Sequence, residues 1–494
     1  MSDLNKKIVT ATKWSGITEI AAKLVSPIST MVLARLLTPD AFGVLVTAVM
    51  VISFAEIFTD AGFQKYLIQH KFRSSEELYQ STTVAFWSNF ILSTLIWIGI
   101  IVFAEEIAIL VGNKGHGDVI AISCICIPLA AFSSIQMALY KRDLNFKTLF
   151  LVRIVGIFIP LIITIPLAYY TRSYWSLIIG MIALNLSNAI ILTVKSKWKP
   201  NFFFSFPLLK EMFSFTFWSM IEAISIWLTG YVDIFIVGTM LNQHYLGIYR
   251  TSMSTVGQIM GLITAATTPV LFSSLSKLQD DDQALKKMFF SFQKLVGIIV
   301  IPMGVGIFLF QDLITNILLG SQWHEAAPFI GLWGLTSAIT IVLSHYCSEI
   351  FRAKGYPKLS VLSQTLYLII FIPVLYFFAH KGFNELYIAR SLVRFVGIII
   401  SLSILFFAIK ISPIKMIINI MPSIISSSFM AIIATICTTI NTSIIWAICS
   451  ILICIICYCA AIGLFPVERH ILKDLINRYM HNISKQKAIN NSNF

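Results

Sequence analysis

Residues 14 to 69 read WSGITEIAAKLVSPISTMVLARLLTPDAFGVLVTAVMVISFAEIFTDAGFQKYLIQ and contain two long apolar segments, Trp14–Leu37 and Ala41–Gln69. The short connection Thr38-Pro39-Asp40 joins them. A helix needs about 20 residues to cross a hydrocarbon layer of about 30 Å, and each segment exceeds that length. Open strands leave backbone groups unsatisfied in lipid, so helices are expected. The stretch therefore predicts two membrane-spanning helices joined by a tight turn.

The composition extends this prediction to the whole chain. Of 494 residues, 57% are hydrophobic and 12% are charged, against about 25% charged in soluble proteins. The net charge of +13 comes from basic residues in many short loops, which is typical of membrane orientation rather than of nucleic-acid binding. The eight cysteines lie mostly in apolar runs and are expected to be free thiols. No signal peptide is evident, so the first span is expected to start membrane insertion.

Charged residues and Pro- or Gly-bearing breaks divide the chain into fourteen segments of spanning length. This pattern predicts an all-α polytopic membrane protein. Alternate loops carry most of the Lys and Arg, so the positive-inside rule places both termini in the cytoplasm. The predicted spans lie at about residues 14–37, 41–69, 76–104, 117–140, 147–170, 173–194, 207–240, 244–277, 283–319, 326–352, 357–379, 383–409, 416–439 and 443–465.

An internal repeat divides these spans into two sets. Residues 36–45 align with residues 240–249 at an offset of 204, and the same offset places Trp14-Ser15 on Trp218-Ser219. The seventh span starts on the same side as the first, so the repeat is parallel, with a pseudo-two-fold axis along the membrane normal. We therefore expect a six-helix bundle at 1–200, a second at 201–412, two additional spans at 413–466 and a basic cytoplasmic tail at 467–494.

Seven cations inside the spans are candidate substrate-binding residues. A charge at mid-membrane costs about 2.5 to 3.5 kcal/mol on insertion scales, so such residues are expected to face something other than lipid. Arg grips phosphate oxygens bidentately and Lys acts as a point charge, so cations at several depths favour a path for a polyanionic head group. Snorkelling to the interface is the alternative for residues near span ends. The candidates are Lys23, Arg35, Arg153, Arg250, Lys294, Arg390 and Arg394.

Four carboxylates inside the spans are candidates for coupling transport to a proton or sodium ion. Glu56 and Asp60 share one face of the second span, and Glu222 and Asp233 share one face of the seventh. Structural ion pairing explains them equally well. The sequence contains no P-loop, no G-x-S-x-G and no metal-ligand cluster, so no other cofactor, no metal and no enzymatic activity are expected.

Leu33–Gly43, followed by Asp60-Ala61-Gly62-Phe63, resembles the opening of bacterial polysaccharide flippases of the multidrug/oligosaccharidyl-lipid/polysaccharide exporter superfamily. The turn of the second half departs from the family, with Asn242-Gln243 where Gly-Pro is frequent. Later stretches agree with the family in order and spacing: Lys141–Lys147, Val232–Tyr249, Pro269–Asp280, Leu319–Pro328 and Ala353–Pro357.

The resemblance implies two bundles around a central cavity and alternating access. The implied substrate is an undecaprenyl-diphosphate-linked oligosaccharide, an O-antigen or capsule repeat unit, moved from the cytoplasmic to the outer leaflet of the bacterial inner membrane. The implied partners are this lipid-linked substrate, membrane lipids and the polymerase and chain-length machinery of the same pathway. Two alternatives stay open: a cation-coupled multidrug or metabolite exporter of the same superfamily, and a membrane-embedded polysaccharide polymerase or glycosyltransferase.

Overall fold

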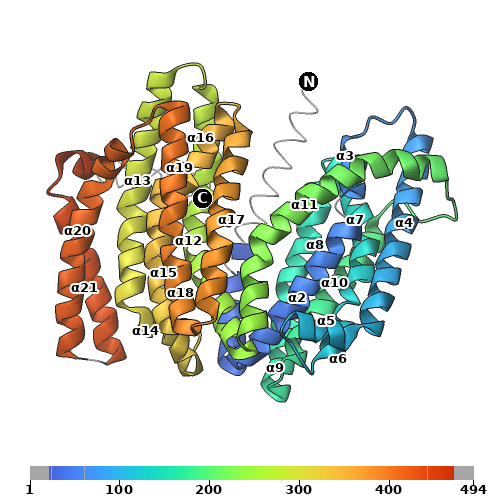
Figure 1. Ribbon diagram of the computed structural model, residues 1–494, viewed down its shortest axis with the longest axis horizontal. Coiled ribbons are helices and arrows are strands. Elements are labelled where there is room, and N and C mark those ends of the chain that lie inside the picture. The colour runs from blue at the N-terminus through green and yellow to red at the C-terminus, as the bar shows by residue number, and fades with distance from the viewer. Residues whose placement is uncertain (1–21, 24, 60–61, 442, 472–494) are drawn as a thin grey trace, which may run out of the picture. The chain divides into compact units, whose positions relative to one another are not determined.

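The computed structural model describes residues 22–23, 25–59, 62–441 and 443–471, and every regular element among them is a helix (Figure 1). Thirteen of these helices are long and apolar enough to cross a membrane, and a shorter apolar helix, Val25–Leu36, precedes them. This last helix lies in the first predicted span, whose opening residues are outside the described part of the chain. The all-α polytopic fold predicted from the hydropathy pattern is thus confirmed.

The described helices after Val25–Leu36 follow one another with short connections. They are α2 (Pro39–Thr59), α3 (Phe63–Gln69), α4 (Ser75–Val102), α5 (Ala104–Leu110), α6 (Gly117–Ser123), α7 (Cys126–Arg142), α8 (Phe146–Ile159), η1 (Pro160–Thr164), α9 (Ile165–Thr171), α10 (Trp175–Lys195), α11 (Phe206–Met240), α12 (Gln243–Lys277), α13 (Asp282–Leu309), α14 (Gln311–Leu318), η2 (Ser321–Ala326), α15 (Ala327–Thr340), η3 (Ile341–His345), α16 (Cys347–Ala353), α17 (Pro357–Ala379), α18 (Phe383–Leu392), α19 (Arg394–Ile409), α20 (Pro413–Ile440) and α21 (Ile444–Ile462).

The chain forms two compact units. Unit 1 comprises Met1–Thr251, Leu318–Trp323 and Leu375–Leu386, and unit 2 comprises the remaining segments, 252–317, 324–374 and 387–494. α11, which the sequence places in the second bundle, packs within unit 1: the indole Nε1 of Trp227 donates to Ser53 Oγ of α2 at 3.0 Å. The division of the chain into bundles at residue 200 stays a prediction.

α2 and α12 cross within unit 1 at two glycines. A Cβ added to Gly43 would lie 2.7 Å from the carbonyl carbon of Gln243, and one added to Gly247 would lie 2.7 Å from the carbonyl carbon of Pro39. Asp40 Oδ2 and His244 Nδ1 lie 3.1 Å apart, and these two residues are 204 positions apart in the sequence. Gly247 and Gln243 lie 204 residues after Gly43 and Pro39, so each contact repeats the other with the two helices exchanged. The crossing therefore has a local two-fold relation.

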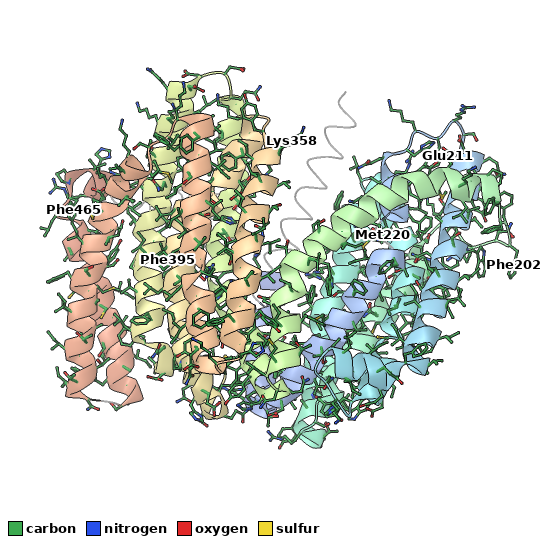
Figure 2. All side chains as sticks on the ribbon, viewed as in Figure 1. Phe202, Glu211, Met220, Lys358, Phe395 and Phe465 are labelled. Atoms are coloured by element: carbon green, nitrogen blue, oxygen red, sulfur yellow. The ribbon has the colours of Figure 1, made fainter. Side chains whose placement is uncertain are left out.

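The second predicted span is interrupted. α2 ends at Thr59 and α3 begins at Phe63, so residues 41–69 do not form one uninterrupted helix; Asp60 and Ala61 are outside the described residues. The guanidinium of Arg142 donates to the carbonyls of Leu67 and His70 at 2.6 and 2.9 Å, which satisfies carbonyls at the end of α3. Tyr66 of α3 donates to Glu211 at 3.0 Å, near the start of α11 (Figure 2).

Unit 2 places the last two spans against α13. The hydroxyl of Tyr458 in α21 donates to the carbonyl of Ile298 at 2.7 Å, and Asn419 Nδ2 in α20 donates to the carbonyl of Phe290 at 2.8 Å. Both bonds satisfy polar side chains in a predominantly apolar segment, where an unmade bond is costly. The two C-terminal spans therefore have defined polar contacts to α13 in addition to apolar packing.

Candidate functional site

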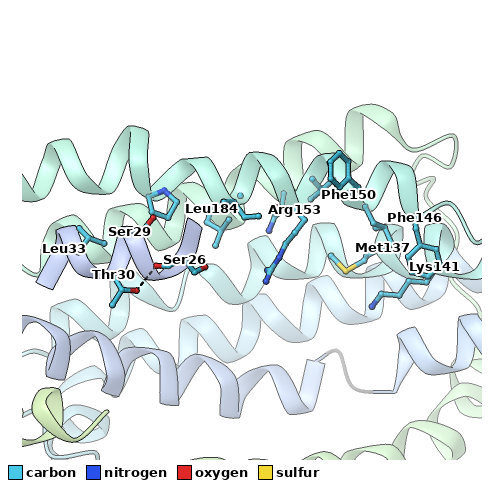
Figure 3. A pocket seen from close by; sticks show the side chains of 16 residues that line it. Ser26, Ser29, Thr30, Leu33, Met137, Lys141, Phe146, Phe150, Arg153 and Leu184 are labelled. Carbon is cyan, nitrogen blue, oxygen red and sulfur yellow. Dashed lines mark hydrogen bonds between the residues drawn. The ribbon is translucent and has the colours of Figure 1, made fainter. Parts of the chain in front are cut away.

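A cavity of about 850 Å³ in unit 1 lies between the Val25–Leu36 helix, α7, α8 and α10 (Figure 3). Its wall combines apolar residues of α8 with hydroxyl groups, an amide and two cations. None of the described residues that line it is acidic. The polar lining residues are Ser26, Ser29, Thr30, Lys141, Arg153 and Asn188.

Arg153 is the predicted site residue that lines this cavity. Its side chain is exposed to the cavity and makes no hydrogen bond or ion pair with the described residues. Lys141, from the end of α7, donates to Gln64 Oε1 over 3.5 Å and points to the same side as Arg153 in Figure 3. The hydroxyls of Ser29 and Thr30 are bonded to carbonyls of their own helix, at 3.3 and 3.0 Å. Lys141 and Arg153 are therefore the charged groups of the cavity wall. A cavity with two positive charges suits an anionic ligand.

The other predicted cations of unit 1 do not line the cavity. Lys23 is half-buried and Arg35 is exposed, and both are engaged with other groups. Arg35 packs against Gly320, where an added Cβ would lie 3.3 Å from Arg35 Cγ. Arg250 is half-buried in α12 and makes no hydrogen bond or ion pair with the part of the chain that the structure describes. The structure thus brings Arg153 together with Lys141 rather than with the other predicted cations.

Lys141 was not predicted as a site residue. The sequence placed it in a loop, where it contributed only to the orientation of the bundle. One signal pointed to it: Lys141 opens Lys141–Lys147, one of the stretches that resemble polysaccharide flippases. Its position one residue before the end of α7 lets a long side chain reach back along the cavity wall.

In unit 2, Arg390 and Arg394 both contact the indole ring of Trp333. Their guanidinium carbons lie 4.7 and 3.9 Å from the ring centroid of Trp333. Arg390 also donates to the hydroxyl of Tyr367 at 3.2 Å, and Arg394 donates to Ser337 Oγ at 2.6 Å. The two arginines share one face, as their spacing of four residues predicts. Cation–π contact with an aromatic ring stabilises guanidinium groups in this partly buried position.

Lys294, the third predicted cation of unit 2, forms an ion pair. Its Nζ lies 2.9 Å from Glu468 Oε1, and the carboxylate is nearly fully buried, with 3% of its side chain exposed. Glu468 follows α21 and lies in the segment that the sequence assigned to a polar tail. The pair therefore links the end of the last span to α13, and it competes with any substrate phosphate for the ammonium of Lys294.

Exchanging the charges of Lys294 and Glu468 distinguishes a structural role of Lys294 from a role in substrate binding. Lys294→Glu alone is expected to destabilise the protein by about 3 to 5 kcal/mol, because it leaves two carboxylates facing each other in a buried site. The exchange Lys294→Glu with Glu468→Lys restores the pair and should restore thermal stability, measured on purified protein. Recovery of stability without transport would assign Lys294 to the substrate path; recovery of both would assign it to structure alone.

The predicted ion-coupling carboxylates have different surroundings. Asp233 is buried in α11, where its Oδ2 accepts from the hydroxyl of Tyr249 at 2.9 Å. Glu56 is half-buried in α2 and engaged with other groups. Asp60 and the side chain of Glu222 lie outside the described part of the chain. Of the four predicted carboxylates, Asp233 is thus the one that the described residues show buried with a defined hydrogen-bond partner. The pairing of carboxylates along a shared face stays a prediction.

Comparison with known proteins gives the family. Residues 32–328 match the family model described as polysaccharide biosynthesis protein. The succinoglycan biosynthesis transport protein ExoT of Rhizobium meliloti is 23% identical over 337 residues, covering 68% of this chain and 67% of the relative. The lipopolysaccharide biosynthesis protein WzxC of Escherichia coli is 21% identical over 378 residues, covering 75% of each chain.

The fold has a solved counterpart. The lipid II flippase MurJ in an inward closed conformation aligns with a TM-score of 0.74 over 93% of this chain and 99% of that one, at 15% identity. This likeness is one of fold. The printed name of ExoT, a transport protein, agrees with the expectation that the chain is not an enzyme. Since the family model covers more than half of the chain, the protein belongs to the family described as polysaccharide biosynthesis protein.

Proposed function

We propose that the protein is a flippase for undecaprenyl-diphosphate-linked oligosaccharide repeat units of O-antigen or capsule. It moves them from the cytoplasmic to the outer leaflet of the bacterial inner membrane by alternating access, with both of its termini in the cytoplasm. The polymerase and chain-length machinery of the pathway then receives the repeat units.

The observation that carries this proposal is the cavity of unit 1. A cavity of about 850 Å³ has room for a phosphorylated head group together with sugar residues. Arg153 offers two guanidinium edges without a competing bond to the described residues, and Lys141 adds a second positive charge. Serine and threonine hydroxyls and the amide of Asn188 supply the neutral polar groups that a sugar needs. The remaining cations, including Arg390 and Arg394 beside Trp333, are proposed to belong to the same path.

Leaflet accessibility of the lipid-linked oligosaccharide tests the proposal. In cells that lack the gene and any redundant flippase, repeat units are expected to stay on the cytoplasmic face, and restoring the gene should release them to the outer face. Normal translocation without the gene would overturn the proposal. Resistance to drugs on overexpression, together with that result, would favour the exporter alternative.

We further propose that a proton or a sodium ion drives transport through Asp233. The carboxylate is buried and already holds one hydroxyl donor, so binding of a cation there would change its interactions with α12, which carries Tyr249. Asp233→Asn is expected to abolish the dependence of transport on the cation gradient in membrane vesicles. The exposed Asp118 serves as the control, since Asp118→Asn should leave gradient dependence unchanged. A gradient response that survives in Asp233→Asn would contradict the role of this residue.

A further inference from the structure

Unit 1 contains a second cavity, of about 540 Å³, that shares no lining residue with the first. It lies where α4 and α8 begin and where α7 and α10 end. All the connections around it belong to the Lys-rich set that the positive-inside rule assigns to the cytoplasm. The cavity is therefore expected at the depth of the lipid head groups, where polar ends of spans meet phosphate.

Charges of both signs line this cavity. Lys195 and Lys197 are exposed, and neither ammonium makes a hydrogen bond or ion pair with the residues that the structure describes. The carboxylate of Asp143, at the end of α7, is exposed and likewise makes none. No ion pair joins the lysines to the aspartate, although they line one cavity. Two positive groups and one negative group are thus available to a ligand at the same time.

Trp198 adds a buried donor. It is 8% exposed and lines the cavity, and its indole Nε1 has no hydrogen-bond partner among the residues that the structure describes. The ring is held by apolar contacts, with centroids 5.4 Å from Phe86 and 6.4 Å from Tyr79. A buried N–H without an acceptor is costly, and native proteins usually satisfy it. An oxygen atom of a ligand in this cavity would do so.

The segment that carries these groups is fixed in place. The hydroxyl of Tyr79 in α4 donates to the carbonyl of Lys199 at 3.0 Å. The ammonium of Lys199 donates to the carbonyl of Thr193 and, at 3.4 Å, to that of Val194, which satisfies the end of α10. Lys199 therefore has a structural role, while its neighbours Lys195 and Lys197 are left for other partners. This local arrangement orders the residues around the cavity before any ligand binds.

We propose that this cavity binds the head group of an aminophospholipid, with phosphatidylethanolamine as the simplest example. The phosphate is held by Lys195, Lys197 and the N–H of Trp198, and the primary ammonium is held by Asp143. The glycerol of phosphatidylglycerol is neutral and leaves the charge of Asp143 uncompensated, and a choline head group has no N–H to donate to it. The proposal concerns a resident lipid and is independent of the transported substrate.

Native mass spectrometry of the full-length protein tests the assignment. The protein is purified in detergent and supplied with equal amounts of phosphatidylethanolamine, phosphatidylglycerol and phosphatidylcholine. The wild type is expected to retain phosphatidylethanolamine at least fivefold more than either of the others. Asp143→Asn should remove the preference over phosphatidylglycerol, and Lys195→Ala with Lys197→Ala should lower retention of both lipids about tenfold.

Two controls accompany this experiment: a double lysine variant outside the cavity, and the melting temperatures of the cavity variants. Lys358→Ala with Lys415→Ala removes two exposed lysines of unit 2 that lie outside the cavity, and retention should stay at the wild-type level. Melting temperatures show that the cavity variants are folded. Trp198→Phe should lower retention of phosphatidylethanolamine, but the exposed lysines and Asp143 carry the test if this variant is unstable. Equal retention of the three lipids by the wild type, or preferential retention of phosphatidylglycerol or phosphatidylcholine, would overturn the proposal.

Discussion

Gly43→Ala is expected to lower the melting temperature of the purified protein sharply and to abolish surface polysaccharide in a complementation assay. The new Cβ would lie within 3.0 Å of the backbone of Gln243, and a backbone carbonyl inside a helix crossing has no rotamer with which to move away. α2 and α12 would have to separate. Overpacking of this kind costs about 1 to 3 kcal/mol and more where the obstructing atoms are backbone.

The two-fold relation of the crossing gives an internal check. Gly247→Ala meets the backbone of Pro39 in the same way and should have an effect of similar size. Gly99 in α4 is the matched control, because an added Cβ there meets nothing within 4 Å, and Gly99→Ala should be neutral or stabilise by up to about 1 kcal/mol. A Gly43→Ala protein with the melting temperature of the wild type would contradict this close contact between α2 and α12.

Arg153→Glu is expected to reduce transport of the lipid-linked oligosaccharide at least tenfold without loss of protein from the membrane. The substitution removes a guanidinium that makes no bond to the described residues and places a negative charge in the cavity. A hydrogen bond to a charged phosphate contributes about 1.5 to 3 kcal/mol, which corresponds to roughly a 10- to 150-fold change in binding. Arg153→Lys keeps the charge but loses the bidentate geometry, so partial activity is expected.

The same helix supplies the control for this experiment. Lys147 of α8 is exposed and does not line the cavity, so Lys147→Glu makes the same change of charge beside it. Surface polysaccharide and membrane levels should match the wild type. If Arg153→Glu and the double variant with Lys294→Glu both give normal polysaccharide, the hypothesis of a cationic path fails.

The sequence predicted the positions of most spans because hydropathy dominates helix placement in lipid. The predicted spans 76–104 and 173–194 correspond to Ser75–Val102 and Trp175–Lys195. The division of the segment 283–319 was not predicted. This segment is divided into α13 and α14 at Phe310, because such a break depends on individual backbone hydrogen bonds that leave the mean hydropathy unchanged.

The candidate site was only partly predictable. Depth in the span and charge identified Arg153, since both are local properties of the sequence. The partners of the charged residues were not predictable, because they come from distant positions. Glu468 pairs with Lys294 from a segment that looked like a polar tail, and Lys141 reaches the cavity from a helix end. Tertiary packing, rather than local pattern, decided which cations are engaged and which face a cavity.

The glycine crossing of α2 and α12 also constrains the order of synthesis and assembly. Its two sides are 204 residues apart, so at about 5 to 20 residues per second the ribosome needs roughly 10 to 40 s between them. During that interval the close contact at Gly43 of α2 lacks its other side, the backbone of Gln243. The crossing can close only after the start of α12 has been synthesised and inserted. A chain truncated before residue 243 would therefore lack one side of this crossing.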